Sequence, residues 1–294
     1  MKKFLLLSIC LTAFNGFSQT FWTAKSTGFS EVSRGLDDIS IVDANVIWAK
    51  AYDGVTTTNA VRQFTRSLDG GNTWTPGTIN LGTNQSLLST SCISAISATT
   101  AWVSAYSNNA NTVLGGIWKT TDAGVTWTKQ TTALFNNTVD SFPNVVHFWD
   151  ANNGFCQGDP ASGFFELYTT TNGGTNWTRV SSVDIPNPLS GEYGYVHNYE
   201  VNSDIIWFGT NKGRIFKSTD KGLTWTVSQS PITDFGGATV SGSFGFKDAN
   251  NGLLVKKSTP PLLYNTTNGG TTWTAVTFNM DASSIRNTSY NHKI

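Results

Sequence analysis

An eight-residue segment that ends in tryptophan recurs five times and constrains the fold more than any other feature of this sequence. Its first copy runs from Ser67 to Trp74, and every copy reads Ser/Thr, any residue, Asp/Asn, any residue, Gly, any residue, Thr/Asn, Trp. The closing tryptophans stand at positions 74, 127, 177, 225 and 273, so they are spaced 53, 50, 48 and 48 residues apart. A self-similar period of this length is typical of a solenoid or a propeller.

The residue types of the segment favour a tight turn. A carboxylate or amide at the third position can accept hydrogen bonds from backbone N–H groups, and glycine at the fifth position permits a positive φ. The tryptophan then opens the next strand with a large apolar ring. We therefore expect these three positions to be structural in all five copies: Asp69, Gly71, Trp74, Asp122, Gly124, Trp127, Asn172, Gly174, Trp177, Asp220, Gly222, Trp225, Asn268, Gly270 and Trp273.

This pattern resembles the Asp-box, or BNR repeat, of sialidases, sortilin-like receptors, some glycan hydrolases and the photosystem II assembly factor family, all of which are β-propellers. The resemblance covers about residues 20 to 280 and implies that the box is a hairpin on the rim, away from the substrate face. Asn172 and Asn268 replace the aspartate in two copies, and Asn176 replaces the threonine before Trp177. Each substitution keeps a hydrogen-bond acceptor in the turn.

Each repeat also contains four short apolar segments, as a four-stranded antiparallel meander requires. In the first repeat they are 39–42, 46–51, 62–66 and 74–76, and the other four repeats follow the same order. The fold class expected is therefore all-β, a β-propeller of four-stranded antiparallel blades with five complete blades plus one split or incomplete blade.

The two ends of the chain carry separate expectations. Residues 1–18 have the basic start and the apolar run of a secretory signal peptide, which leaves residues 19–294 as the propeller. Phe21 to Lys25 is expected to be the outer strand of the last blade, because Trp22 precedes Trp74 by one period. Only 21 residues follow Trp273, fewer than a further blade needs, so we expect a C-terminally incomplete propeller, the front part of a longer polypeptide.

Composition limits the partners. Removal of Lys2 and Lys3 would leave 17 basic against 19 acidic residues, which argues against nucleic acid, since that partner requires a basic face. No stretch approaches the roughly 20 apolar residues of a membrane span. We expect a secreted or cell-surface monomer that binds an extracellular glycan or protein, with Cys92 and Cys156 as two separate buried thiols.

Strand parity places the Asp-boxes on one face and the longer loops on the other. The loops include Tyr52 to Val61 and Gln157 to Gly163, and binding residues concentrate on such loops. The densest polar and aromatic cluster is 192–200, at the start of the fourth repeat. The ligand-binding candidates on this face are Glu192, Tyr193, Tyr195, His197 and Asp159, with the packing of the tyrosines between blades and a satisfied channel histidine as the alternative.

No catalytic motif is recognisable, so no catalytic residue, cofactor or metal is assigned. His147, His197 and His292 are few and scattered, and the Arg-Ile-Pro motif expected of a sialidase is missing. A pair of carboxylates could still hydrolyse a glycoside. The acids on or near the loop face that could form such a pair are Asp53, Asp140, Asp159, Glu166, Glu192 and Asp234.

The sequence is compatible with three functions. The first is a secreted, non-catalytic Asp-box propeller that serves as an extracellular glycan- or protein-binding scaffold, a class that recurs in exported proteins of type IX secretion. The second is a glycoside hydrolase of the sialidase-like or glucan-cleaving propeller type. The third is an assembly or stability factor like the photosystem II family. Fold resemblance does not choose among them.

Overall fold

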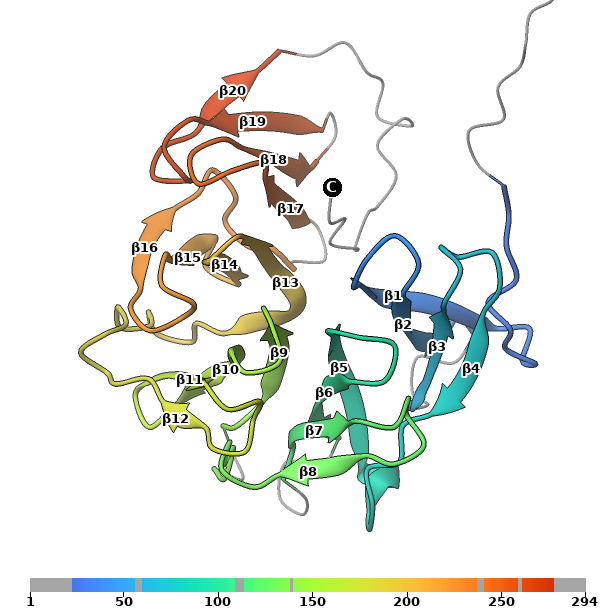
Figure 1. Cartoon of the computed structure of the whole chain (residues 1–294). Coiled ribbons are helices and arrows are strands. Elements are labelled where there is room, and N and C mark those ends of the chain that lie inside the picture. Colours follow the sequence, from blue (N-terminus) through green and yellow to red (C-terminus); the bar gives the residue numbers. More distant parts are fainter. Residues whose placement is uncertain are drawn as a thin grey trace, which may run out of the picture.

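The computed structural model describes residues 23–55, 60–108, 114–137, 140–236, 241–258 and 261–277. Within these ranges the strands form five four-stranded sheets, and every neighbouring pair within a sheet is antiparallel. Figure 1 shows the sheets following one another around an arc as blades of a propeller. The predicted all-β propeller with five four-stranded blades is confirmed.

The strands follow the chain in order from blade to blade. The first blade is β1 (Arg34–Ile41), β2 (Ile47–Asp53), β3 (Gln63–Ser67) and β4 (Thr75–Thr78). The second is β5 (Leu88–Ala95), β6 (Ala101–Ser107), β7 (Gly116–Thr120) and β8 (Thr128–Gln130). The third is β9 (Pro143–Phe148), β10 (Gly154–Ala161), β11 (Phe164–Thr170) and β12 (Thr178–Arg179). The fourth is β13 (Gly194–Asn202), β14 (Ile205–Thr210), β15 (Arg214–Ser218) and β16 (Thr226–Gln229). The fifth is β17 (Ser241–Phe246), β18 (Gly252–Lys257), β19 (Leu262–Thr266) and β20 (Thr274–Val276).

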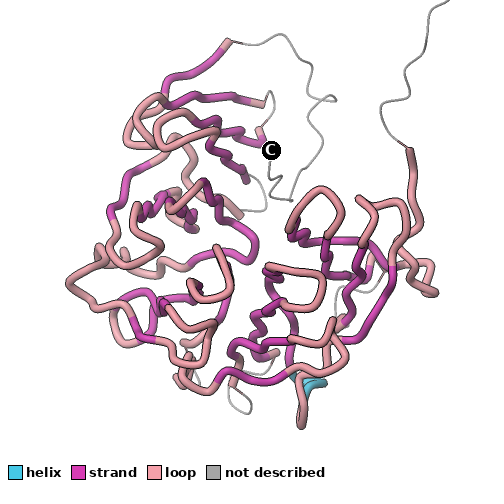
Figure 2. Tube along the Cα trace, viewed as in Figure 1, coloured by secondary structure: helices cyan, strands magenta, loops and turns pink. Residues whose placement is uncertain are grey.

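The first strand of each blade is the innermost one. β1 contacts β5, β5 contacts β9, β9 contacts β13 and β13 contacts β17, so the innermost strands line the centre of the arc. Figure 2 shows how little regular structure other than strand is present, and the one helical segment described is a 3₁₀ turn, η1 (Gln85–Leu87). Side chains at the centre therefore come from residues that are far apart in the sequence.

The Asp-box turns hold themselves together by hydrogen bonds. In the first box, the Thr73 N–H and hydroxyl donate to the two carboxylate oxygens of Asp69 at 2.8 and 2.7 Å, and the Gly71 N–H donates to the Ser67 hydroxyl at 2.8 Å. The amide oxygen of Asn172 accepts the equivalent backbone bond at 2.8 Å in the third box. Hydrogen bonds from the side chain and backbone of Thr73 lower the pKa of Asp69 to about 2.

Aromatic side chains join the blades. Trp102 of the second blade stacks on Phe148 of the third with ring centroids 3.5 Å apart, and Trp207 of the fourth stacks on Phe246 of the fifth at 4.1 Å. The box tryptophan Trp225 is buried against Phe155 of the preceding blade. The box glycine Gly222 has a φ of +88°, and a Cβ there would lie 2.6 Å from the Phe155 ring. The glycine is therefore required by conformation and by space.

The segment after residue 22 does not form the predicted outer strand of the last blade. Thr23 to Lys25 are in no strand and lie beside the first blade, where the Lys25 ammonium donates to the Asn72 side chain at 3.1 Å. A little further on, the Thr65 hydroxyl donates to the Thr27 carbonyl at 2.8 Å. These bonds hold the segment where the chain enters β1. Residues 1–22 and 278–294, with the predicted signal peptide and split blade, lie outside the described residues.

Two smaller expectations concern the cysteines and the membrane. Cys92 and Cys156 are both free and buried, as predicted. Within the described ranges, no helix has the length and apolar character needed to cross a membrane.

Candidate functional site

Tyr193 is an exposed aromatic residue that the sequence pattern assigns to the loop-rich face. Its side chain is 42% exposed, and its ring meets that of Tyr195 edge-on at 5.3 Å. The Tyr193 N–H donates to the Asn211 side chain at 2.8 Å, and the Asn211 N–H returns a bond to the Tyr193 carbonyl at 3.1 Å. The Tyr195 hydroxyl donates to Asp234 at 2.7 Å. Tyr193 is therefore presented to solvent by a backbone and a neighbour that are both fixed.

Glu192 faces the interior, unlike Tyr193. It is 4% exposed and forms an ion pair with Arg214, whose Nε donates to Oε1 at 3.0 Å. The Thr210 hydroxyl and the Leu189 N–H donate to the same carboxylate at 2.6 and 2.7 Å. Burial alone would raise the pKa of Glu192, but the bonds from Arg214, Thr210 and Leu189 outweigh it and lower that pKa. Glu192 thus anchors the loop that carries Tyr193.

Asp159 has the opposite electrostatic character. Burial raises its pKa to about 7, and the two donors that reach it, the Asn144 amide and the Gly194 N–H, counteract this only in part at 2.8 and 2.9 Å. Both bonds fall on Oδ1; the Asn144 bond lies within the third blade, and the Gly194 bond ties that blade to the start of β13. A carboxyl group with this pKa exchanges a proton near neutral pH, which is the property required of a general acid.

The remaining acids proposed for a carboxylate pair each have a partner. Asp53 pairs with Arg34 at 2.9 Å, Asp140 accepts from the Asn137 amide at 2.9 Å, and Asp234 accepts from Tyr195. Glu166 is buried and accepts bonds from the Ser141 and Tyr168 hydroxyls at 2.6 and 2.9 Å. None of these contacts joins one acid of the set to another.

His197 lies deeper, where β13 departs from regular pairing. Gly194 pairs with Thr210 and Tyr199 with Phe208, so residues 195–198 stand opposite the single residue Gly209. A Cβ on Gly209 would lie 2.6 Å from Oδ1 of Asn198, so glycine makes room for this bulge. His197 within the bulge has a φ of 59°, an uncommon conformation for a residue other than glycine. The bulge turns the imidazole toward the centre of the propeller.

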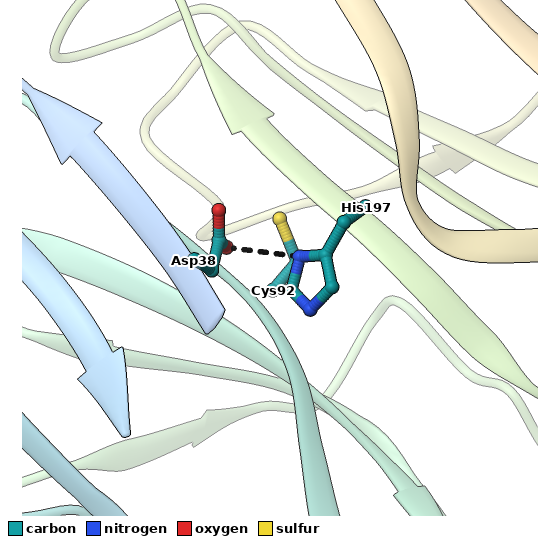
Figure 3. Close-up of side chains that lie close together, drawn as sticks. All are labelled: Asp38, Cys92 and His197. Carbon is teal, nitrogen blue, oxygen red and sulfur yellow. Dashed lines mark ion pairs between the residues drawn. The ribbon is translucent and has the colours of Figure 1, made fainter. Parts of the chain in front are cut away.

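Asp38 of β1 and Cys92 of β5 meet His197 there, as Figure 3 shows. One potential ligand atom from each residue lies within 4.8 Å of the other two, and His197 Nδ1 is 3.4 Å from Asp38 Oδ2. Cys92 is fully buried, and the side chains of Asp38 and His197 are each 12% exposed. Burial raises the pKa of the Cys92 thiol well above its usual range, so without a bound ion Cys92 is a thiol.

The sequence pattern points to His197 but not to its two neighbours in this cluster. Asp38 and Cys92 carry no recognisable metal-site spacing, and the three residues come from blades one, two and four. The one local signal is that Asp38 and Cys92 occupy matched positions, each directly after an extra residue in the innermost strand of its blade. This match becomes visible only when the pairing register of the strands is known, and the sequence alone does not give that register.

Five meander blades closed by Asp-box hairpins define the chain as a β-propeller of the BNR-repeat type. Within it, residues 110–239, which contain three of the five boxes, match the family described as photosynthesis system II assembly factor YCF48. No curated protein sequence matches the chain.

Several solved structures resemble the chain at low identity. The GH74 xyloglucanase of Xanthomonas campestris is 17% identical with a TM-score of 0.54, over 83% of this chain and 38% of that one. The GH74 enzyme of Niastella koreensis is 16% identical with a TM-score of 0.54, over 82% of this chain and 38% of that one. A structure of YCF48 bound to a D1 peptide is 18% identical with a TM-score of 0.40, over 83% and 82% of the two chains. The chain thus spans 38% of the length of the two GH74 structures, and the likeness shows the propeller fold alone.

Proposed function

We propose that this chain is a non-catalytic binding propeller whose loop-rich face recognises a polypeptide. The observation that carries the proposal is the presentation of Tyr193, an exposed ring on a backbone fixed by Asn211 and braced by Tyr195. Rigid tyrosines are effective anchors because they offer a large contact area and lose little conformational freedom on binding.

Two further exposed apolar residues lie close to Tyr193 in the sequence, and we propose that they extend this anchor into a small apolar surface. Leu189 is 49% exposed and Val196 is 37% exposed, and both lie within four residues of Tyr193. The buried Glu192–Arg214 ion pair fixes the residue directly before Tyr193. An exposed apolar surface with a fixed backbone and a polar rim is typical of a protein-interaction site.

The match of residues 110–239 with an assembly-factor family supports a polypeptide rather than a glycan, because an assembly factor acts on other proteins. We further propose that the protein is exported, with residues 1–18 removed. The N-terminal sequence of the protein purified from its natural source tests this point, since a mature chain that retains Lys2 and Lys3 contradicts it.

Site-specific photo-crosslinking tests the binding surface. A benzophenone amino acid is placed at position 193, and the matched control places it at Leu223, which is 55% exposed in the fourth Asp-box on the opposite face. We expect a discrete polypeptide adduct from position 193 alone, and loss of at least about 10-fold in affinity for that partner in Tyr193→Ala. Equal adducts from both positions, or binding to a glycan array with no polypeptide adduct, would contradict the proposal.

A glycoside hydrolase is the second candidate, and the pKa of about 7 at Asp159 is the observation that favours it. Hydrolysis also needs a second carboxylate about 5–9.5 Å away, and the other described acids of this face are each engaged with another group, which is why binding ranks first. Turnover of chromogenic glycosides or polymeric glucans that disappears in Asp159→Asn and survives in Leu223→Ala would reverse this order.

A further inference from the structure

We propose that Asp38, Cys92 and His197 form a binding site for a divalent metal ion of the zinc class at the centre of the propeller. The three side chains contribute one carboxylate oxygen, one sulfur and one imidazole nitrogen, all within 4.8 Å of one another. These are the three ligand types that zinc accepts, and three protein ligands leave one position of a tetrahedral site for water.

The spacing of the nitrogen and oxygen ligand atoms agrees with a shared ion. Two atoms bound to one zinc at about 2.0–2.2 Å and a tetrahedral angle lie roughly 3.4 Å apart. Nδ1 of His197 and Oδ2 of Asp38 are 3.4 Å apart. Nδ1 is buried, and its contact with this carboxylate oxygen does not have the geometry of a hydrogen bond. A metal ion between the two atoms would bind both of them directly.

The backbone is irregular at, or directly before, each of the three residues. Asp37 is an extra residue in β1 just before Asp38, Ser91 is an extra residue in β5 just before Cys92, and His197 lies inside the four-residue bulge of β13 at a φ of 59°. Bulges re-aim side chains, and strained conformations of this kind cluster at functional sites. Three independent strands are therefore bent in ways that bring three ligand types to one point.

The charges around the site suit a divalent cation. Lys50 is buried and acts electrostatically on Asp38, but it is paired with Asp37 at 2.6 Å, so Asp37 offsets its charge. A divalent ion with the Asp38 carboxylate and a Cys92 thiolate is also neutral overall. A thiolate ligand selects zinc-like ions over magnesium or calcium, which prefer oxygen.

Binding has a defined proton balance. The Cys92 thiol, which in this structure contacts the Val146 carbonyl at 3.4 Å, gives up its proton and its sulfur binds the metal. The neutral imidazole of His197 donates its Nδ1 lone pair, and Asp38 binds as the carboxylate. The Cys92 thiol therefore releases one proton for each ion bound.

The site would connect blades one, two and four directly, because its ligands come from β1, β5 and β13. A metal bound there stabilises the folded state by mass action and holds the β13 bulge in place. This inference is independent of the polypeptide ligand proposed above.

Metal titration of the full-length, tag-free protein tests the proposal. After treatment with a chelator and reloading with zinc, we expect one tightly held zinc per chain, release of protons on binding, and a higher thermal midpoint. Cobalt(II) in place of zinc should give thiolate-to-metal charge-transfer absorption in the near ultraviolet. Magnesium and calcium should give none of these effects.

Matched variants separate the site from adventitious binding. Cys92→Ser, His197→Gln and Asp38→Asn should each lower zinc affinity by about 100-fold or more. Asp38→Asn keeps an acceptor for the Ile93 N–H, which donates to Asp38 at 2.6 Å, so its fold is expected to survive. Cys156→Ser is the control, because Cys156 is equally buried but lies outside the cluster. Any of three results would overturn the proposal. The wild type fails to retain zinc, its cobalt spectrum lacks a thiolate band, or zinc affinity falls equally in Cys92→Ser and Cys156→Ser.

Discussion

The Asp-box turns recur in all five blades and a one-residue bulge recurs in the innermost strands of the first three, but the two irregularities differ in what they hold constant. Each box repeats the same side-chain chemistry, with the carboxylate or amide of the third residue bonded inside its own turn. The bulges repeat only their position: the extra residue is Asp37 in β1, Ser91 in β5 and Asn144 in β9. The boxes therefore maintain the fold, whereas the bulges vary the chemistry at its centre.

The electrostatics of the two regions differ in the same way. Internal hydrogen bonds lower the pKa of Asp69 and Asp122 to about 2, so these box carboxylates are ionised and fully engaged. Beside the β9 bulge, where the Asn144 amide donates to it, Asp159 has its pKa raised by burial to about 7. A carboxylate whose hydrogen bonds are all made within its own turn has no acceptor left for a ligand. A carboxyl group whose pKa is shifted by burial is a candidate for function.

The largest effect is expected from loss of a box tryptophan. Trp225 is 6% exposed and lies against Phe155 and Phe208, so Trp225→Ala should lower the free energy of unfolding by about 3–5 kcal/mol. Urea unfolding measures this difference. Leu223→Ala in the same box is the control, because that side chain is 55% exposed and its loss should stay within about 0.5 kcal/mol. Similar effects of the two changes would contradict a structural role for the box.

The next effect concerns Asp159 and pH. The folded state keeps the Asp159 proton up to a pKa of about 7, whereas the unfolded chain releases it near pH 4, so the wild type loses stability as the pH rises through this interval. Asp159→Asn imitates the protonated form and keeps an acceptor for Gly194. It should match the wild type near pH 4 and exceed it by roughly 1–4 kcal/mol above pH 7.

Unfolding by denaturant at a series of pH values checks this prediction. If the free energy of unfolding of Asp159→Asn varied with pH as that of the wild type does, ionisation of Asp159 would not destabilise the fold. The electrostatic contrast between the two regions would then disappear.

The smallest effect is expected from Asp122→Asn. Asparagine already occupies the equivalent position at Asn172 and Asn268, so the variant should fold normally at neutral pH. Because the folded pKa of Asp122 is about 2, its ionised form stabilises the wild type above pH 4, and this contribution is lost as the pH falls from 4 to 2. The variant should lack that acid-dependent loss. Thermal midpoints across this range measure it, and an unchanged acid slope would mean that the box carboxylate is not coupled to folding.

The fold could be predicted because its determinants are local. The turn chemistry of the box is contained in eight consecutive residues, and the predicted segment 46–51 corresponds to β2 at Ile47–Asp53. The predicted outer strand at Phe21 to Lys25 failed in its described part because it depended on closure of the ring, a long-range event. The sequence held no local signal for the bonds that tie Lys25 to the first blade.

The site could be predicted only in outline for the same reason. The cluster 192–200 was identified from its composition, but Glu192 is committed to Arg214, which lies 22 residues further along the chain. The neighbours of His197 are more distant still, since Asp38 and Cys92 come from other blades. Which side chains meet at the centre depends on strand register, and a single extra residue changes that register.

An extra residue in an innermost strand also has a consequence for how such a scaffold diversifies. Because it interrupts the alternation of inward and outward side chains at one point only, the outer three strands of the blade keep their pairing whatever that residue is. A lineage of propellers built this way can exchange acid, hydroxyl or amide groups along its axis, one blade at a time, while the exterior of the molecule is inherited unchanged.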